Sequence, residues 1–236
     1  MKKTPHLECS NCPNIKKGNS LFNQIENKKL KEVSDTKKCL FFKKGETVFY
    51  EGNMPTGIYC VFSGKIKLYR TGSEGKNQII KIFQKGDIIG YRSILSDQRY
   101  ILSASTIEDS FICFIPKETL YDLIKTNSNF SMGIIKKISC ELGITSKIIT
   151  NMAQKSVRER LAELLLILKT QFGITQDNII RVHLSREEIA DTIGCSTETT
   201  IRLLSEFKKD KTIDLIGKKI KIIDLNNLFQ IANISE

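Results

Sequence analysis

Residues 184–210, LSREEIADTIGCSTETTIRLLSEFKKD, decide the fold of the C-terminal part of the chain. Ser185 is followed three residues later by Glu188, which is the spacing of a capping box at the start of a helix. Gly194 permits a sharp turn, and Ser196 can cap a second helix. The apolar positions expected to lock the two helices together are Ile189, Ala190, Ile193, Leu203, Leu204 and either Thr200 or Ile201. The stretch therefore predicts a helix-turn-helix.

The start of the second helix carries side chains suited to the edges of DNA bases. The residues expected to face a major groove are Thr197, Glu198, Ile201 and Arg202. Arg202 can donate two hydrogen bonds to guanine, Glu198 can accept one from cytosine, and threonine or isoleucine methyl groups can contact thymine. The alternative for Glu198 and Arg202 is an i,i+4 ion pair on a solvated helix.

Other polar residues around the same two helices are placed to contact DNA phosphates, which gives affinity and register without reading sequence. These residues are Ser185, Arg186, Thr199, Lys208 and Lys209, and Ser196 completes the predicted DNA-binding set. The leucine-rich segment 157–172 predicts a helix before this region, and 212–223 predicts a strand, turn and strand. Residues 155–236 are therefore expected to form a winged helix-turn-helix.

The N-terminal half has a different pattern. From Phe41 to Ile115 it contains short β-rich runs broken by glycine: TVFYEG, GIYCVFSG, KIKLYRTG, QIIKIFQKG, DIIGYRS and SFICFIP. This spacing predicts a small β-sandwich or roll. After Pro116 the apolar period changes from two to about 3.6, which predicts a short helix in KETLYDLIK and a longer one from about Ser131 to Met152. The fold class is α+β.

The longer helix carries an apolar stripe. Its positions follow one another at alternating intervals of three and four residues: Ile135, Ile138, Leu142, Thr145, Ile149 and Met152. This is the seam of a two-stranded coiled coil, so 126–154 is predicted to be a dimerisation helix. The alternative is a stripe that packs only on its own domain. In a homodimer the two recognition helices would lie about 34–36 Å apart, one DNA turn, on a palindromic site.

Composition limits the class of protein. Lys and Arg total 37 against 26 Asp and Glu, a net charge of +11, which favours a polyanionic partner such as nucleic acid or an anionic membrane surface. No apolar stretch reaches the roughly 20 residues of a membrane-spanning helix. The start MKKTPHLECSNCPN lacks the apolar region of a secretion signal, and the seven cysteines are scattered. A cytoplasmic protein with reduced or metal-bound thiols is expected.

The expected domain order is a cysteine-containing segment (1–20), with little core of its own, a sensor domain (21–125), the dimerisation helix (126–154) and the DNA-binding domain (155–236). A signal at the cysteine-containing segment or the sensor domain would change how the dimerisation helix packs against its partner in the dimer. This change would reposition the two recognition helices. A competing hypothesis is a sensor module that regulates a protein partner. Enzymatic function is not expected, because His6 and His183, the only histidines, have no evident catalytic partner.

Several of these segments together resemble the Crp/Fnr family of bacterial transcription regulators over residues 9–225. The matching pieces are GETVFYEG at 45–52, IYCVFSGKIKLY at 58–69, GDIIGYRS at 86–93, CFIP at 113–116 and LSREEIADTIGCSTETTIRLL at 184–204. The resemblance implies a cyclic-nucleotide-binding-like β-roll of the double-stranded jelly-roll type, a homodimer, and RNA polymerase as a partner. It also implies that Glu198 and Arg202 read the G·C pair of a TGA-type half-site. Ile201 stands where Fnr-like members often carry serine.

The resemblance is closer to the Fnr-like branch than to the branch that binds cAMP. In the latter, a Gly-Glu dipeptide and an Arg-Ser-Ala run hold the ribose and the cyclic phosphate. Here the corresponding residues are Gly90-Tyr91 and Leu102-Ser103-Ala104, so the carboxylate and the arginine are missing. Burying a phosphate without a cation is costly, and cAMP is therefore not expected. Thr145-Ser146 does match the pair that meets the base in that branch.

The oxygen-sensing branch implies an iron–sulfur cluster. Its ligands are an N-terminal cysteine group and one cysteine after a late strand of the β-roll, which correspond to Cys9, Cys12 and Cys113. The third N-terminal cysteine is absent near Gly18, and the open corner could be filled by His6, Asp35, Cys39 or an external ligand. The alternatives are zinc, thiol redox sensing, no metal at all, or a β-roll that senses a small molecule. Cys60 and Cys195 are expected to be packing residues, and Cys39 and Cys140 are ambiguous.

Overall fold

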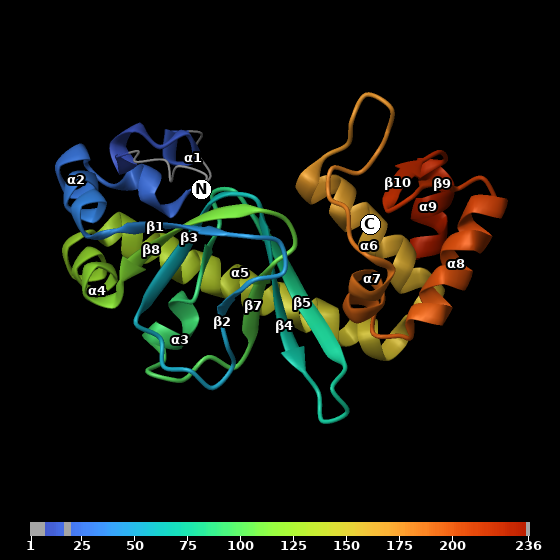
Figure 1. The fold of residues 1–236 in the computed structure, drawn as a ribbon, viewed down its shortest axis with the longest axis horizontal. Coiled ribbons are helices and arrows are strands. Elements are labelled where there is room, and N and C mark those ends of the chain that lie inside the picture. Colours follow the sequence, from blue (N-terminus) through green and yellow to red (C-terminus); the bar gives the residue numbers. More distant parts are fainter. Residues whose placement is uncertain (1–7, 17–19, 235–236) are drawn as a thin grey trace. The chain divides into compact units, whose positions relative to one another are not determined.

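The computed structural model describes residues 8–16 and 20–234. The chain forms two compact units, the first made of residues 1–70 and 80–143, the second of 71–79 and 144–236 (Figure 1). The boundary at 143/144 falls inside one long helix, α5 (Ser128–Gln154), which contributes to both units. Within the described residues, no helix is long and apolar enough to cross a membrane.

Unit 1 is built on two four-stranded sheets. The first has the order β1-β8-β3-β6, with strands Lys38–Phe42, Ser110–Pro116, Gly57–Ser63 and Ile88–Ile89. The second has the order β2-β7-β4-β5, with strands Thr47–Phe49, Ser103–Thr106, Lys65–Thr71 and Asn77–Gln84. Buried side chains from both sheets share one core, which includes Phe49, Ile66, Ala104 and Ile112. The predicted β-roll is confirmed.

A helical layer covers the other face of the first sheet. Its elements are η1 (Cys9–Asn11), α1 (Pro13–Lys16), η2 (Leu21–Gln24), α2 (Asn27–Thr36), α3 (Tyr91–Leu95), α4 (Lys117–Thr126) and the start of α5. Ile58 and Ile115 of the sheet pack in a second core with Val33, Leu120 and Phe130 of the helices. Every helix of this layer therefore depends on the first sheet for burial of its apolar face.

One expectation about unit 1 is corrected. DIIGYRS was expected to be a strand, but only Ile88–Ile89 pairs, because Gly90 adopts a φ of 88° and turns the chain into α3. The N-terminal segment has little core of its own, and Cys9 is instead buried in the core of the helical layer. Cys9 N–H donates to Ser34 Oγ of α2 (2.7 Å), and Asn14 Nδ2 donates to the Phe62 carbonyl of β3 (2.7 Å).

Helix α5 is tied to the β-roll through one carboxylate. Glu141 accepts a hydrogen bond from the Tyr91 hydroxyl at the start of α3 and pairs with Lys81 of β5 (Nζ to Oε1 2.9 Å). Burial alone would raise the pKa of Glu141, but the hydrogen bonds from Tyr91 and Lys81 outweigh it and hold that pKa below its ordinary value. The ionised form of Glu141 therefore fixes α5 in its place on the roll.

The apolar stripe of α5 does not pack on its own domain, so that alternative is wrong. Ile135, Ile138, Leu142 and Ile149 are 55%, 40%, 68% and 65% exposed, whereas Phe130 and Ile134 make the contacts with the core. Thr145 is also exposed. Met152, at the end of the stripe, is half-buried and lies beside the turn at Gly194. An isolated chain thus leaves most of the stripe in water.

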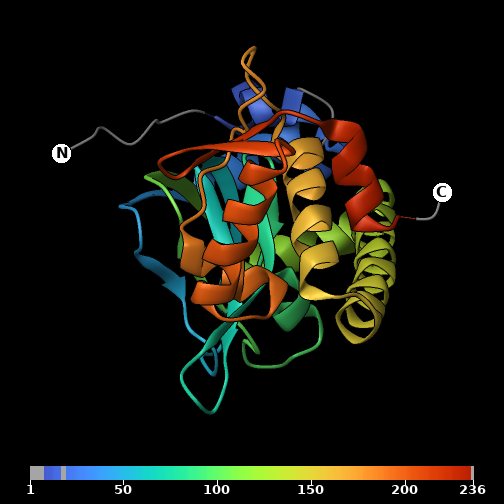
Figure 2. The same ribbon diagram turned by 90° about the vertical axis from the view of Figure 1, so that its right-hand side faces the viewer.

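Unit 2 contains the predicted winged helix-turn-helix. Its elements are the end of α5, α6 (Val157–Phe172), α7 (Arg186–Ile193), α8 (Thr197–Lys209), β9 (Ile213–Ile216), β10 (Lys219–Ile222) and α9 (Leu225–Ala232). α6 carries the main apolar face and packs against α7 and α9 (Figure 2). β9 and β10 pair as an antiparallel hairpin, which is the wing.

Arg160 of α6 joins the end of α5 to the turn between α7 and α8. Its guanidinium donates to the carbonyls of Ile193 (2.8 Å), Gly194 (3.4 Å), Lys155 (2.8 Å) and Met152 (3.4 Å). The last carbonyls of a helix have no partner within the helix, so an arginine that reaches two helix ends satisfies both. This residue fixes the helix-turn-helix against the end of the long helix.

We expect Arg160→Met to lower the free energy of unfolding by about 1.5–3 kcal/mol, because carbonyls at two helix ends lose a charged donor. Urea denaturation at neutral pH measures this loss. Arg181→Met is the matched control, since Arg181 is exposed and donates to the Ile174 carbonyl in a loop. Its change is expected to stay within about 0.5 kcal/mol. Equal losses in the two variants would contradict the role given to Arg160.

We expect Glu141→Gln to be less stable than the wild type by about 1–2 kcal/mol at pH 7. Because the folded-state pKa of Glu141 is lowered, its contribution is complete above the unfolded value of about 4.3 and is lost as pH falls through the folded pKa. The difference between variant and wild type should therefore shrink below about pH 4 in urea titrations. Glu74→Gln, which removes an exposed carboxylate, serves as the control. A difference independent of pH would exclude charge as its source.

Candidate DNA interface and cysteine pocket

Side-chain caps fix both helices of the helix-turn-helix, as predicted. Ser185 and Glu188 form the complete capping box of α7: Glu188 N–H donates to Ser185 Oγ (3.0 Å), and Ser185 N–H donates to Glu188 Oε2 (2.8 Å). Gly194 has a φ of 67°, and a Cβ there would lie 3.3 Å from Met152 Cε. The turn therefore favours glycine for its backbone conformation, and a Cβ would also press on the end of the Met152 side chain. Ser196 caps α8 by accepting from Thr199 N–H (3.1 Å).

The start of α8 exposes the residues predicted to read bases. Glu198 is exposed, Ile201 is 48% exposed, and Thr197 is half-buried. Thr200, in contrast, is completely buried, so it is Thr200 and not Ile201 that packs between the helices. Hydrogen bonds from its own backbone amide and from Ser196 hold the pKa of Glu198 below its ordinary value. Glu198 is thus a carboxylate at neutral pH and can accept a hydrogen bond from a base amine.

Arg202 does not pair with Glu198, which corrects the alternative of an i,i+4 pair between them. It pairs with Glu206 one turn later, and Glu206 also accepts from Arg158 of α6 (3.0 Å). The Arg202 side chain is 64% exposed. Glu206 was missed in the sequence, although its spacing of four residues from Arg202 is the signal that could have found it. It is placed to orient Arg202.

The residues expected at phosphates lie at both ends of the helix pair and beside the wing. Arg186 donates to the Gly217 carbonyl in the wing turn (3.0 Å), so part of its guanidinium ties α7 to the wing. Thr199 is half-buried beside the Ser196 cap, and Lys209 is exposed at the end of α8. Lys208 pairs with Asp214 of β9 (2.9 Å). The wing adds exposed lysines that the sequence reading had not singled out, Lys218 and Lys219.

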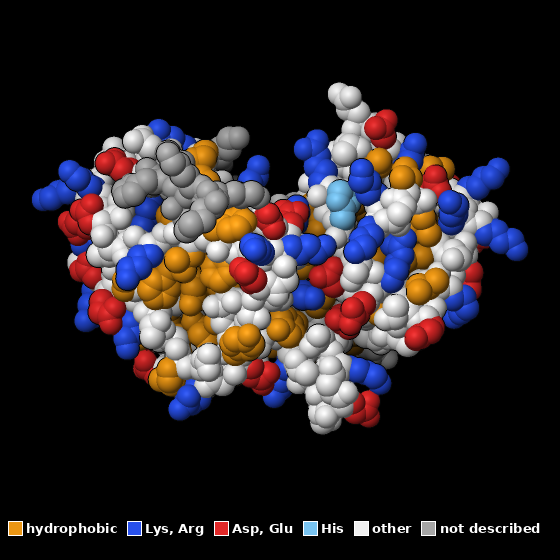
Figure 3. Space-filling model, viewed as in Figure 1, with side chains coloured by type: hydrophobic (Ala, Val, Ile, Leu, Met, Phe, Trp, Pro, Cys, Tyr) orange, Lys and Arg blue, Asp and Glu red, His pale blue; other side chains and the backbone are white. Residues whose placement is uncertain are grey.

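Net charge alone does not mark this unit as the DNA-binding part. Residues 144–236 carry nearly equal numbers of basic and acidic side chains, and most of the positive excess lies in the N-terminal part of the chain. Figure 3 shows Lys and Arg interspersed with Asp and Glu over the unit that contains α6 to α9. A DNA-binding surface in this unit is therefore marked by the positions of its charged side chains on α8 and the wing and not by their number.

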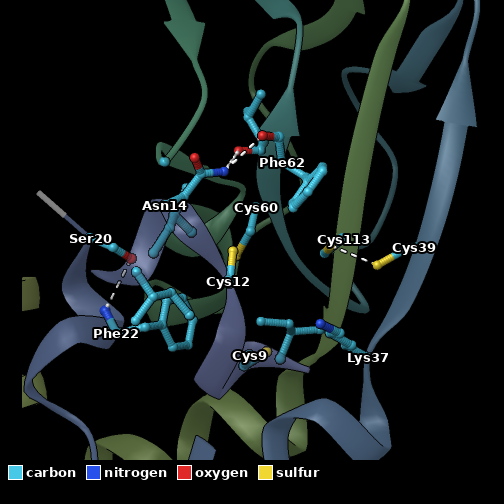
Figure 4. A pocket seen from close by; sticks show the side chains of 15 residues that line it. Cys9, Cys12, Asn14, Ser20, Phe22, Lys37, Cys39, Cys60, Phe62 and Cys113 are labelled. Carbon is cyan, nitrogen blue, oxygen red and sulfur yellow. Dashed lines mark hydrogen bonds between the residues drawn. The ribbon is translucent and has the colours of Figure 1, made fainter. Parts of the chain in front are cut away.

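A second site lies where the N-terminal segment meets the first sheet. Five cysteines line one pocket there: Cys9, Cys12, Cys39, Cys60 and Cys113 (Figure 4). Cys9 and Cys12 come from the N-terminal segment, whereas the other three come from β1, β3 and β8. The pocket thus brings together the three predicted ligands and Cys39, one of the candidates named for the open corner, and it also contains Cys60, which was expected to be a packing residue. Cys140 is exposed on α5, and Cys195 packs in the helix-turn-helix beside Thr200 Oγ1 (3.2 Å).

The three cysteines of the sheet form one row across neighbouring strands. Cys39 lies opposite Cys113 in the β1–β8 pair, and Cys60 lies opposite Cys113 in the β3–β8 pair. Residues directly opposite in a sheet point to the same face, so all three thiols face the N-terminal segment. The Sγ atoms of Cys39 and Cys113 are 2.8 Å apart. Sequence spacing gave no hint of this row, because it depends on strand register.

Lys37, between α2 and β1, places a positive charge beside these thiols. Burial alone would lower its pKa, but Cys9, Cys113 and Cys39 hold that pKa above its ordinary value. The hydrogen bond to Cys39 and burial raise the pKa of the Cys113 thiol, and burial raises that of Cys60. These thiols are therefore protonated at neutral pH unless a metal or another cation compensates the thiolate.

The donor set consists of thiols, which as thiolates are ligands of iron–sulfur clusters and of zinc. Among the described residues, no group of three or more His, Cys, Asp or Glu side chains is arranged to hold one metal ion. The thiolates of an iron–sulfur cluster bind different irons and do not have to converge on one point. Asp35 does not line the pocket. His6 and the position near Gly18 lie outside the described residues.

The residues that correspond to the cyclic-nucleotide-binding residues make contacts within the protein. Tyr91, where the ribose-binding glutamate would stand, is 3% exposed, and its hydroxyl is bound to Glu141. Ser103 and Ala104 lie in strand β7, and Ser103 Oγ accepts from the Glu51 N–H (2.9 Å). These residues offer no carboxylate for a ribose and no cation for a phosphate.

Comparison with known proteins supports both halves of this description. Residues 39–127 match the cyclic nucleotide-binding domain, and residues 159–231 match the Crp-like helix-turn-helix domain. The fumarate and nitrate reduction regulatory protein of Vibrio cholerae is 30% identical over 91% of this chain and 85% of its own length. Electron transport regulator A of Shewanella oneidensis is also 30% identical, over 89% of this chain and 84% of its own length.

Solved structures agree with the fold. FixK2 from Bradyrhizobium japonicum superposes with a TM-score of 0.77 at 20% identity, over 85% of this chain and 99% of that one. A transcriptional regulator of the Crp/Fnr family from Eubacterium rectale superposes with a TM-score of 0.73 at 21% identity. The match covers 91% of this chain and 98% of that one. The names of the two sequence relatives and of the Eubacterium rectale protein are those of regulators. With both domains matched and relatives at 30% identity along most of its length, the chain belongs to the Crp/Fnr family of DNA-binding transcription regulators.

Proposed function

We propose that this regulator binds a palindromic DNA site as a homodimer and that an iron–sulfur cluster in the cysteine pocket makes its DNA binding respond to oxygen or redox state. The observation that carries the proposal is the pocket in which five cysteines from two separate parts of the chain meet. Such a pocket couples the N-terminal segment to the sheet on which α5 rests. A DNA target supports a location in the cytoplasm.

The DNA part of the proposal rests on α8. Its exposed first turns present a carboxylate at Glu198 and a guanidinium at Arg202, a pair that suits the two bases of a G·C pair. We assign them to a TGA-type half-site, with Thr197 and Ile201 beside them. Ser185, Ser196, Thr199 and the basic residues Arg186, Lys208 and Lys209 lie around the same surface and are assigned to phosphates. RNA polymerase is the partner expected of such a regulator.

The dimer part rests on α5. A surface that exposes Ile135, Ile138, Leu142 and Ile149 along one helix is unfavourable in water unless a second copy covers it. Two copies joined along α5 would present two α8 helices to the two half-sites of a palindrome. Met152 links this seam to the helix-turn-helix, because it contacts the turn at Gly194.

The sensing part rests on the pocket. A bound iron–sulfur cluster would supply oxygen-sensitive iron–thiolate chemistry, and Cys9, Cys12 and Cys113 are the residues proposed to hold it. The names of the relatives place those proteins in the control of fumarate and nitrate reduction and of electron transport. A second candidate is metal-free thiol redox sensing, which the 2.8 Å contact between the Cys39 and Cys113 sulfurs favours.

Arg202→Ala is expected to lower the affinity for a duplex with two TGA half-sites by about 10-fold to 100-fold and to weaken discrimination against an A·T pair at the contacted G·C position. Fluorescence anisotropy at fixed salt measures both effects. Lys219→Ala on the wing is the control: it should weaken all sequences alike and reduce the dependence on salt. If the double variant Glu198→Ala, Arg202→Ala binds like the wild type, α8 does not read DNA.

Protein purified without oxygen is expected to be brown, to contain iron and sulfide, and to bleach in air. Visible absorption and iron and zinc analysis, before and after exposure to air, test this. Cys113→Ser should lose the iron, whereas Cys140→Ser should keep it, because Cys140 lies on an exposed face of α5. Colourless wild-type protein without iron would overturn the proposal of a cluster. Its zinc content would then distinguish a zinc site from metal-free thiol sensing.

A further inference from the structure

The pocket holds more cysteines than the three predicted ligands, and the sheet supplies the extra ones. We propose that Cys39 of β1 is the fourth ligand of the cluster, so that the cluster is held by Cys9 and Cys12 from the N-terminal segment and by the neighbouring pair Cys39 and Cys113 from the sheet. This inference rests on the proposed cluster. It replaces a ligand from the N-terminal segment with one from a β-strand.

Strand register is the first argument. β1 is an edge strand that pairs only with β8 in its sheet, and this pairing sets Cys39 directly opposite Cys113. Their sulfurs are 2.8 Å apart, so any group bound by Cys113 on this face lies within reach of Cys39. A change to another staggered rotamer at either residue would move the two sulfurs apart.

The neighbouring charge is the second argument. Binding converts each thiol into a thiolate, its proton leaves to solvent, and the bond that forms is iron to sulfur. Lys37 lines the same pocket as Cys9, Cys39 and Cys113, which belong to both parts of the pocket. Its ammonium group offsets the negative charge that these three thiolates bring into a partly buried site.

Cys60 is the competing candidate, because it lines the same pocket in the next position of the row. It lies in the interior strand β3, flanked by β8 and β6, and its thiol is packed against the core of the helical layer. Cys39 lies at the edge of the sheet, where the side chain can move without disturbing that core. We therefore assign ligation to Cys39 and packing to Cys60.

The test compares single alanine variants of the full-length chain after anaerobic reconstitution with ferrous iron and sulfide. The readouts are iron and acid-labile sulfide per chain and the visible spectrum, none of which depends on DNA binding. Cys39→Ala should lose the cluster to the same extent as Cys113→Ala. Cys60→Ala and Cys140→Ala should keep the wild-type content.

The other outcomes separate this inference from the proposed function. A cluster that survives Cys39→Ala but is lost in Cys60→Ala makes Cys60 the ligand and overturns the inference alone. A cluster that survives both variants but is lost in Cys113→Ala shows three cysteine ligands with a ligand from elsewhere. If the wild-type protein takes up no iron, both the proposed cluster and the assignment of Cys39 as its ligand are wrong.

A measurement on the wild type covers the case in which Cys39→Ala fails to fold. Alkylation with iodoacetamide without oxygen, followed by mass spectrometry, reports which thiols are free. Cys39 should be protected in the iron-loaded protein and modified after a chelator removes the iron, whereas Cys140 should be modified in both. Modification of Cys39 at the same rate with and without iron would overturn the assignment.

Discussion

The structure of unit 1 depends on the burial of both faces of the sheet β1-β8-β3-β6. One face packs on the second sheet, and the other supports the helical layer, which includes the N-terminal segment and the start of α5. A sheet covered on both sides buries far more apolar area per residue than one with a face in water. The cysteine row, the N-terminal segment and the dimerisation helix therefore share one support.

This shared support gives a physical route from the pocket to the long helix. The N-terminal segment contributes Cys9 to the same core that contains Phe130 and Ile134 of α5. Glu141 adds a polar tie between α5 and the roll through Tyr91 and Lys81. Packed cores tend to shift between discrete arrangements instead of deforming smoothly, so under the proposed function a change at the pocket would act first on the start of α5.

At its C-terminal end, α5 is joined to α6 and α7 by hydrogen bonds. Arg160 holds the carbonyls at the end of α5 and at the end of α7. Lys155 and Asn151 both bind the buried carboxylate of Glu163 on α6 (2.9 Å and 2.8 Å), which closes the corner between α5 and α6. The recognition helix is thus fixed to the last turn of the helix that is proposed to dimerise.

The sequence by itself determined the order of elements, the caps of α7 and α8, the turn at Gly194 and the stripe of α5, because these depend on residues only a few positions apart. It also assigned Cys9, Cys12 and Cys113 through a resemblance. Only the tertiary structure decided that Arg202 pairs with Glu206, that Thr200 is buried instead of Ile201, and that Tyr91 begins a helix. It alone set Cys39, Cys60 and Cys113 in one row, because strand register and the packing of distant segments are settled by the whole core and not by local spacing.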